Sequence, residues 1–365
     1  MSDIETAIAT AVKQQLPLTP DEVTVEWLSD VLGQKVKSTE FTQKTLLATA
    51  SKLHITITYD DPVAARVAGK PTYICIKGGF NPEMIKQYGH TGLIAIYKRE
   101  AEFFSKVAPT ISRMNLVRCY WAGSDSNQGI VILDDLASPE MGMSFGEPTA
   151  AWPVSRVLAG VEQLASLHAS AWGASYDQYP WLVNQYDQTF ITLCGMWKDM
   201  MLAEGRPPHP ADWNEQRITA VFKKLFDTRN NNTSLPHCLL HGDPHVGNTY
   251  IDKNGAPGFL DWQLIHIGSP FHDVAYFVVG AMTVSDRKAH EMDILKHYLV
   301  SLEKLGGPVL GFEEARVEYR KYILAGIGWM LTPYGMQPKE RVLAMSERYL
   351  SAIVDHQAVE LIESL

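Results

Sequence analysis

The stretch from Leu239 to Gln263 constrains this chain most, because it places three oxygen-bearing side chains around a predicted hairpin. An apolar run ends in a His-Gly-Asp turn that lifts the carboxylate of Asp243 off a strand end. Asn248 follows five residues later, and an Asn-Gly pair then separates two short apolar runs before Asp261. Asn-Gly in this setting is a strong hairpin signal. A hairpin brings Asn248 beside Asp261, with Asp243 just upstream.

These three side chains match the needs of Mg²⁺-dependent phosphoryl transfer. Magnesium takes hard oxygen ligands and the substrate phosphates, while a free carboxylate orients and deprotonates the attacking hydroxyl. The pattern therefore predicts Asp243 as the catalytic base and Asn248 and Asp261 as metal ligands.

Two other interpretations of the same stretch stay open. His241, Asp243 and His245 alternate, as ligands of a transition metal in a metal-dependent hydrolase do when they share one face of a strand. Pro244 interrupts a strand there, and no further His/Asp cluster completes such a site. The second alternative is a structural turn without chemistry.

The order Asp, Asn, Asp follows the kinase catalytic loop and its metal-binding aspartate. Here the loop reads His-Gly-Asp-x-x-x-x-Asn, and Asp261 is followed by Trp-Gln rather than Phe-Gly. This form resembles the aminoglycoside phosphotransferase and choline kinase-like family, small-molecule kinases built on the protein-kinase fold. The resemblance extends from about Lys37 to Leu331 and is sharpest between Asp243 and Asp261.

The resemblance implies a nucleotide site in the first third of the chain. Lys77 ends a predicted strand and should hold the α- and β-phosphates, oriented by a glutamate from the next helix. That helix contains Arg-Glu-Ala-Glu-Phe-Phe, similar to the family's Arg-Glu-x-x-Phe-Tyr, and Glu100 occupies the matching position. Glu102 would face elsewhere and is the second choice.

Two further nucleotide contacts follow from the resemblance. No Gly-x-Gly-x-x-Gly is present, and a turn of small residues ending at Ser51 joins the first two predicted strands instead. Ser51 and nearby N–H groups are candidate phosphate contacts. The run that ends in Asp134, Asp135 and Leu136 resembles the hinge, so main-chain groups from Asp134 to Leu136 should meet the adenine edge.

Other polar residues are expected to support the catalytic loop. His241, and with it His245, should fix the loop by hydrogen bonding. Asp273 should cap the helix that it opens and brace the loop. The acceptor should lie among the C-terminal helices, where aromatic side chains can host a cation. The candidates are Trp172, Trp197, Tyr276, Trp329 and Tyr334.

Periodicity predicts an α+β chain of two lobes, and the resemblance implies that they form a protein-kinase-like bilobal fold. Residues 1–136 should form a small lobe with an antiparallel sheet and one main helix, and residues 137–365 a larger, mainly helical lobe. A helix is predicted over Pro20–Leu32, with Thr19 as N-cap and Gly33 as its stop.

The bulk properties limit location and partners. A net charge of −9 argues against a general nucleic-acid or anionic-membrane binder, and no segment approaches the roughly 20 apolar residues of a membrane span. The four cysteines are scattered, without a Cys-x-x-Cys pair, as expected of free thiols in a reducing compartment. The N-terminus lacks the pattern of a signal peptide, so we expect a cytoplasmic protein.

The sequence thus predicts an ATP- and Mg²⁺-dependent phosphotransferase that moves the γ-phosphoryl group to a hydroxyl of a small molecule. GTP as the donor stays possible, and the sequence identifies neither the acceptor nor the oligomeric state. A kinase-like protein that binds nucleotide without transferring phosphate is the non-enzyme alternative.

Overall fold

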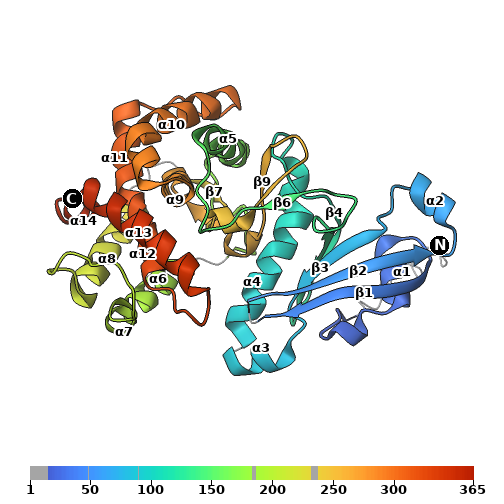
Figure 1. Ribbon diagram of the computed structural model, residues 1–365. Coiled ribbons are helices and arrows are strands. Elements are labelled where there is room, and N and C mark those ends of the chain that lie inside the picture. The colour runs from blue at the N-terminus through green and yellow to red at the C-terminus, as the bar shows by residue number, and fades with distance from the viewer. Residues whose placement is uncertain (1–14, 48, 89, 183–185, 232–236) are drawn as a thin grey trace, which may run out of the picture. The chain divides into compact units, whose positions relative to one another are not determined.

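The computed structural model describes residues 15–47, 49–88, 90–182, 186–231 and 237–365 (Figure 1). These residues form two compact units. The first unit contains the described residues up to Ala108 together with Val117–Ser138, and the second contains Pro109–Leu116 and Pro139–Leu365.

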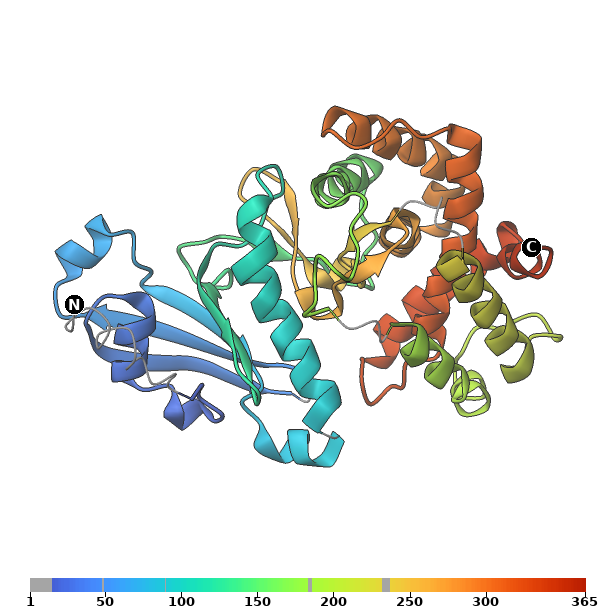
Figure 2. The ribbon, with the colours of Figure 1, turned by 180° about the vertical axis from the view of Figure 1, so that it is seen from behind.

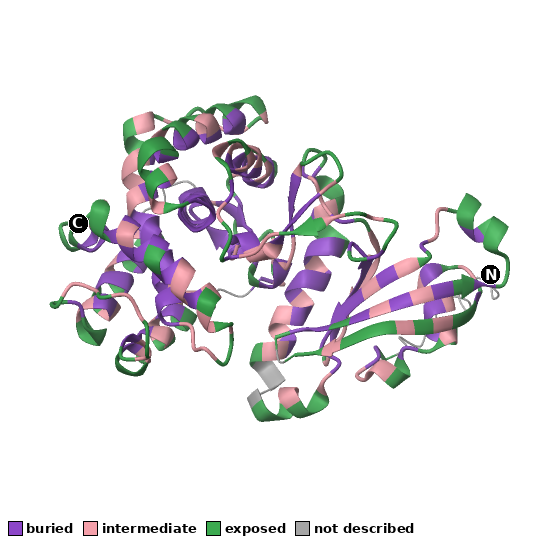
Figure 3. Ribbon diagram, in the orientation of Figure 1, coloured by how far each residue is buried: buried purple, intermediate pink, exposed green. Residues whose placement is uncertain are grey.

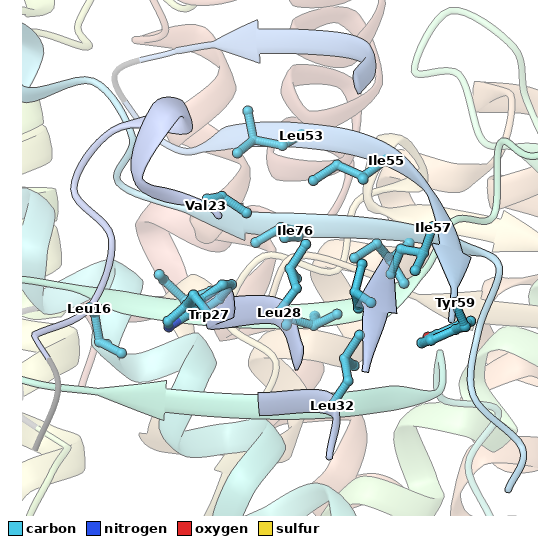
Figure 4. Close-up of a cluster of buried hydrophobic side chains, with 14 of the residues drawn as sticks. Leu16, Val23, Trp27, Leu28, Leu32, Leu53, Ile55, Ile57, Tyr59 and Ile76 are labelled. Atoms are coloured by element: carbon cyan, nitrogen blue, oxygen red, sulfur yellow. The ribbon is translucent and has the colours of Figure 1, made fainter. Parts of the chain in front are cut away.

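A five-stranded antiparallel sheet is the centre of the first unit. Its strand order is β1-β2-β3-β5-β4. The strands are β1 (Val36–Leu46), β2 (Ser51–Tyr59), β3 (Tyr73–Gly78), β4 (Cys119–Ser124) and β5 (Gly129–Asp134). Because side chains alternate along a strand, Leu53 and Ile55 of β2 join Ile76 of β3 on one face. This face packs against helix α1 (Val25–Leu32) around Trp27 (Figure 4).

Helix α1 is shorter than the sequence predicted. A 3-10 turn covers Pro20–Glu22, and the α-helix begins at Val25. The predicted N-cap at Thr19 is wrong: Thr19 precedes the 3-10 turn and makes no side-chain cap bond, whereas the hydroxyl of Thr24 accepts the N–H of Trp27 at 3.2 Å. The predicted stop at Gly33 is confirmed, with a left-handed φ of 61°.

The opposite face of this sheet carries the main helix of the unit, α4 (His90–Glu102) (Figure 2). A π-helical turn, Phe103–Val107, extends it. The remaining helices of this unit are short and lie between strands: α2 (Pro62–Val67) and α3 (Pro82–Tyr88).

The second unit is mainly helical. Its helices are α5 (Val154–Ser170), α6 (Tyr186–Cys194), α7 (Trp197–Met201), α8 (Glu215–Asn231), α9 (Pro270–Ala281), α10 (Val284–Lys304), α11 (Phe312–Tyr322), α12 (Ile327–Met330), α13 (Lys339–Asp355) and α14 (Ala358–Glu363). Helix α9 is buried along its whole length, as its colour in Figure 3 shows, so it forms the centre of this unit. No helix of the described chain has the length and apolar character to cross a bilayer.

Short strands carry the stretch from which the sequence analysis began. Strand β7 (Cys238–Leu240) pairs with β10 (His266–Gly268), and β6 (Ser144–Phe145) extends a hairpin of β8 (Thr249–Ile251) and β9 (Pro257–Phe259). The predicted hairpin is confirmed, with Thr249 opposite Phe259. Gly255 has a φ of +84° in its turn, which explains the glycine there.

Candidate active site

The turn after β7 requires a glycine. Gly242 has a φ of +87°, and a Cβ at this position would lie 2.1 Å from the carbonyl oxygen of Leu264. Only glycine avoids both the strain and the clash. The tight turn therefore fixes the backbone from which Asp243 projects.

Asp273 of α9 braces this turn. Its Oδ2 accepts the main-chain N–H of His241 at 2.6 Å, and its Oδ1 accepts that of Gly242 at 3.0 Å. The predicted brace is confirmed. The predicted helix cap is wrong, because Asp273 lies a turn inside α9, after the N-cap position at Ser269, and its oxygens bind the loop instead.

The Asp273 carboxylate is a buried charge with a full set of donors. His168 Nε2 lies 3.3 Å from its Oδ2, and His272 Nδ1 lies 3.2 Å from its Oδ1. Burial opposes ionisation, but the hydrogen bonds from these two histidines hold the pKa of Asp273 well below its usual range. The loop is thus anchored to a charge in the protein interior.

The two histidines of the loop serve its backbone, as predicted. His241 Nε2 donates to the carbonyl oxygen of Leu260 at 2.9 Å, and its Nδ1 accepts the N–H of Asp243 at 3.2 Å. His245 Nδ1 accepts the N–H of Gly247 at 3.0 Å. Because both ring nitrogens of His241 are already engaged, the transition-metal interpretation loses one of its three ligands.

Asp243 is held by two side-chain donors. Asn248 Nδ2 lies 3.2 Å from its Oδ2 and 3.0 Å from its carbonyl oxygen, and the phenol of Tyr276 donates to its carboxylate. The side chain is 28% exposed. Burial first, and then the charge of Asp261, raise the pKa of Asp243 to about 8, while the hydrogen bonds from Tyr276 and Asn248 act in the opposite direction.

Asp261 projects from the end of the hairpin in a strained conformation. It has a φ of 67°, an uncommon value for a residue other than glycine. The preceding residue, Leu260, donates its N–H to the carbonyl oxygen of Asn248 at 2.8 Å, so the hairpin pairing continues to the base of Asp261. The structure therefore brings Asp243, Asn248 and Asp261 together within the second unit.

Lys77 and Glu100 meet within the first unit. Lys77 Nζ lies 2.8 Å from Glu100 Oε2 and 3.0 Å from Oε1, and both side chains are less than a tenth exposed. Glu102, two positions along α4, accepts from Ser124 at 2.7 Å instead. The geometry of the pair is that predicted for Glu100, and Glu102 faces elsewhere as expected.

The sheet places Lys52, rather than Ser51, on the face that carries Lys77. Lys52 is directly opposite Lys77 in the antiparallel register, and paired residues share a face. Ser51 alternates to the other face, where its hydroxyl is fully buried and has no hydrogen-bond partner within the described chain. The proposed phosphate contact from the Ser51 side chain stays a prediction. Lys52, and not Ser51, shares the sheet face of Lys77.

The predicted hinge follows β5. The side chain of Asp134 accepts from Tyr120 at 2.6 Å, and that of Asp135 lies 3.0 Å from His54 Nδ1 on β2. The N–H of Asp134 is used by the carbonyl oxygen of Arg118. No hydrogen bond among the described residues uses the main-chain N–H of Leu136.

Sequence reasoning did not assign Tyr276 or Lys52 to these roles. Tyr276 follows Asp273 by one helical turn, so the two share a face of α9, and this spacing was the available signal. For Lys52 the signal was its alternation with the apolar residues of β2. Of the other aromatic candidates, Trp329 packs edge-on against His245 at 5.1 Å and Trp197 against His209 at 5.4 Å.

Solved structures define the fold class. The Plasmodium vivax ethanolamine kinase is 12% identical, with a TM-score of 0.52 over 87% of this chain and 83% of that one. LicA in complex with AMP is 14% identical, with a TM-score of 0.50 over 92% and 98% of the two chains. LicA is described elsewhere as the choline kinase of Streptococcus pneumoniae, in a structure with 15% identity, a TM-score of 0.49 and coverage of 94% and 99%. The chain has the α+β, protein-kinase-like fold of the small-molecule kinases.

A family match agrees with this fold. The model of the "Phosphotransferase enzyme family" matches residues 162–303, which include Asp243, Asn248 and Asp261. No protein of curated function matches this sequence. The resemblance to the aminoglycoside phosphotransferase and choline kinase-like family is confirmed, and the match supports a kinase-like phosphotransfer enzyme.

Proposed function

We propose that this protein is an ATP- and Mg²⁺-dependent phosphotransferase that moves the γ-phosphoryl group of the nucleotide to a hydroxyl of a small molecule. The observation that carries the proposal is the arrangement of Asp243, whose carboxylate is held by Asn248 and lies near the charge of Asp261. Residues 1–136 would bind the nucleotide, and residues 137–365 would carry the catalytic loop and the acceptor.

Within the nucleotide site, Lys77 would contact the α- and β-phosphates. The ion pair with Glu100 orients its Nζ. Lys52 adds a second positive charge on the same face. The N–H of Leu136 and the main chain near Asp134 would meet the adenine edge, and Ser51 would act through the backbone of its turn.

The residues of the second unit fit a magnesium ion. Asn248 donates its Nδ2 to Asp243, which leaves its Oδ1 as a neutral hard ligand, and Asp261 supplies a carboxylate. Both are oxygen ligands of the kind that Mg²⁺ takes, with phosphate and water completing its coordination. The ion would neutralise charge on the β- and γ-phosphates.

Asp243 would accept the proton of the acceptor hydroxyl as the oxygen attacks the γ-phosphorus. The bond from that phosphorus to the β,γ-bridging oxygen then breaks, and ADP leaves. A cation held by Asp261 would offset the repulsion that helps to raise the pKa of Asp243, and so would favour the carboxylate form. Tyr276 and Asn248 keep that carboxylate in one orientation.

A cytoplasmic location is part of the proposal. All four cysteines are free thiols, which fits a reducing compartment where ATP is abundant.

The test is a screen of hydroxylated metabolites with the purified full-length chain, ATP and Mg²⁺, in which ADP formation and phosphorylated product are both measured. We expect acceptor-dependent ADP release that requires Mg²⁺. Asp261→Ala should weaken Mg–ATP binding, and an unchanged dependence on Mg²⁺ in that variant would refute the assignment of Asp261.

A further inference from the structure

A buried chain of hydrogen bonds crosses the second unit and ends at a partly exposed residue, Tyr186. Asp273 is its centre, with His168 on one oxygen and His272 on the other. Tyr298 bonds the far nitrogen of His168 at 2.9 Å, and Tyr186 of α6 bonds the far nitrogen of His272. Tyr298, His168 and Asp273 are fully buried, whereas Tyr186 retains exposed surface.

The polarity of this chain follows from Asp273. An ionised carboxylate only accepts hydrogen bonds, so each histidine must donate an N–H to it. A ring that carries one proton then offers its remaining nitrogen as an acceptor, and the phenol beyond that nitrogen donates its hydrogen. Tyr186 therefore uses its hydrogen toward His272, and only the acceptor lone pairs of its oxygen remain for another group.

The phenol of Tyr186 is fixed beside the catalytic carboxylate. Its ring stacks on His266, with centroids 4.3 Å apart and planes 12° from parallel, and packs on Phe190 at 4.8 Å. His266 in turn lies against Gly242, the residue before Asp243, because a Cβ on Gly242 would come within 2.9 Å of the His266 Nδ1. The charge of Asp243 adds to burial in raising the pKa of Tyr186. The Tyr186 oxygen is thus a rigid hydrogen-bond acceptor near the proposed base.

We propose that Tyr186 selects acceptors that carry a second hydrogen-bond donor, a hydroxyl or an ammonium group, next to the hydroxyl that is phosphorylated. The inference rests on the proposed function. Asp243 takes the reactive hydroxyl, and the Tyr186 oxygen accepts from the neighbouring donor of the same molecule. A substrate that presents only hydrogen-bond acceptors at this point would face the lone pairs of the Tyr186 oxygen and is therefore disfavoured.

The test uses the best acceptor from the metabolite screen and two sets of its analogues. In the first set, each hydrogen-bond donor other than the phosphorylated hydroxyl is replaced in turn by hydrogen. In the second set, a hydroxyl becomes a methoxy group or an amine becomes a dimethylamino group, and the pH is chosen so that the dimethylamino group is uncharged. The kcat/KM values are measured for the wild type, Tyr186→Phe and Tyr298→Phe. Tyr298→Phe is the matched control, because it removes the phenol at the opposite end of the same chain.

In the wild type, one donor position of the substrate should be more sensitive than the others. At that position, replacement by hydrogen and replacement by the methylated group should each lower kcat/KM about 10- to 100-fold, the cost of one buried hydrogen bond. In Tyr186→Phe the same replacements should cost less than about threefold, since the partner is gone. Tyr298→Phe should keep the wild-type pattern.

Equal losses in the wild type and in Tyr186→Phe would overturn the proposal, as would a best acceptor with no second donor. If the enzyme phosphorylates the methoxy analogue but not the deoxy analogue, Tyr186 donates a hydrogen bond to the substrate, and this result also overturns the proposal. The wild-type comparison needs no variant, so it stands even where Tyr186→Phe fails to fold. Absence of phosphorylation of every compound would instead refute the proposed function.

Discussion

Replacing Asp273 by asparagine should destabilise the second unit and disorder the catalytic loop. The carboxylate accepts four hydrogen bonds, two from main-chain N–H groups of the loop and two from histidines. An asparagine has one acceptor oxygen, so it keeps at most two of them and turns an NH₂ group toward two donors. Each lost bond to a charged acceptor is worth about 1.5–3 kcal/mol, which gives a loss of about 3–6 kcal/mol.

Urea unfolding, followed by circular dichroism and tryptophan fluorescence, measures this loss as a shift in midpoint at constant slope. The control is Asp293→Asn on α10, where a carboxylate that is 75% exposed pairs with Lys296. That pair should contribute less than about 1 kcal/mol. A loss for Asp273→Asn as small as that of the control would refute the buried-brace argument.

The same substitution has a predicted dependence on pH. Because the folded-state pKa of Asp273 lies well below its unfolded value of about 3.9, its contribution is fully present above that pH. It is lost as the pH falls further toward the folded pKa. The difference in stability between wild type and Asp273→Asn should therefore be constant from pH 5 to 7 and shrink below about pH 4.

Three further substitutions test separate parts of the account. Tyr276→Phe removes one donor from the Asp243 carboxylate but keeps the ring, so kcat should fall about tenfold, the cost of one hydrogen bond, while the KM for ATP is unchanged. Lys52→Ala should raise the KM for ATP about fivefold, as expected for one partly solvated charge. His266→Gln should flatten the acid loss of stability. Burial lowers the pKa of His266 to about 3, so the wild type should lose about 1.4 kcal/mol per pH unit below about 6.5, and denaturation at pH 5 and 7 measures the difference.

Matched controls decide what these results mean. Tyr319→Phe removes another buried phenol that donates to a carboxylate, that of Glu291 at 3.4 Å, and should lower stability without changing kcat. Lys37→Ala removes an exposed lysine of β1 in the same sheet and should leave the KM for ATP unchanged. If Tyr276→Phe or Lys52→Ala has the same effect as its control, the assigned role is contradicted. If His266→Gln keeps the wild-type slope of stability against pH, the neutral buried imidazole of His266 is contradicted.

The sequence predicted those features that depend on local spacing. The Asn-Gly turn sets the hairpin register, so Asn248 and the end of β9 could be placed together in advance. The strand-end lysine and the next helix similarly led to the Lys77–Glu100 pair, with the family resemblance choosing between Glu100 and Glu102. Fold class followed from the change of periodicity near residue 137.

Features that depend on long-range packing were not predictable in the same way. Thr19 and Thr24 both carry a capping hydroxyl, and only the observed backbone shows that Thr24 caps α1. The donor from Tyr276 to Asp243 and the phenol of Tyr186 come from separate helices, and no sequence spacing links Tyr186 to the loop. Alternation on β2 does distinguish Lys52 from Ser51, once the pairing with β3 is known.

The central claim is that Asp243 acts on the acceptor hydroxyl while other groups bind the nucleotide. The most direct test measures Mg–ATP binding by calorimetry and phosphate transfer to the screened acceptor for wild type and Asp243→Asn. The variant should bind Mg–ATP within about threefold of the wild type but transfer phosphate at least about 10²-fold more slowly. Near-wild-type transfer by the variant, or a wild type that binds ATP and phosphorylates no acceptor, would contradict the account.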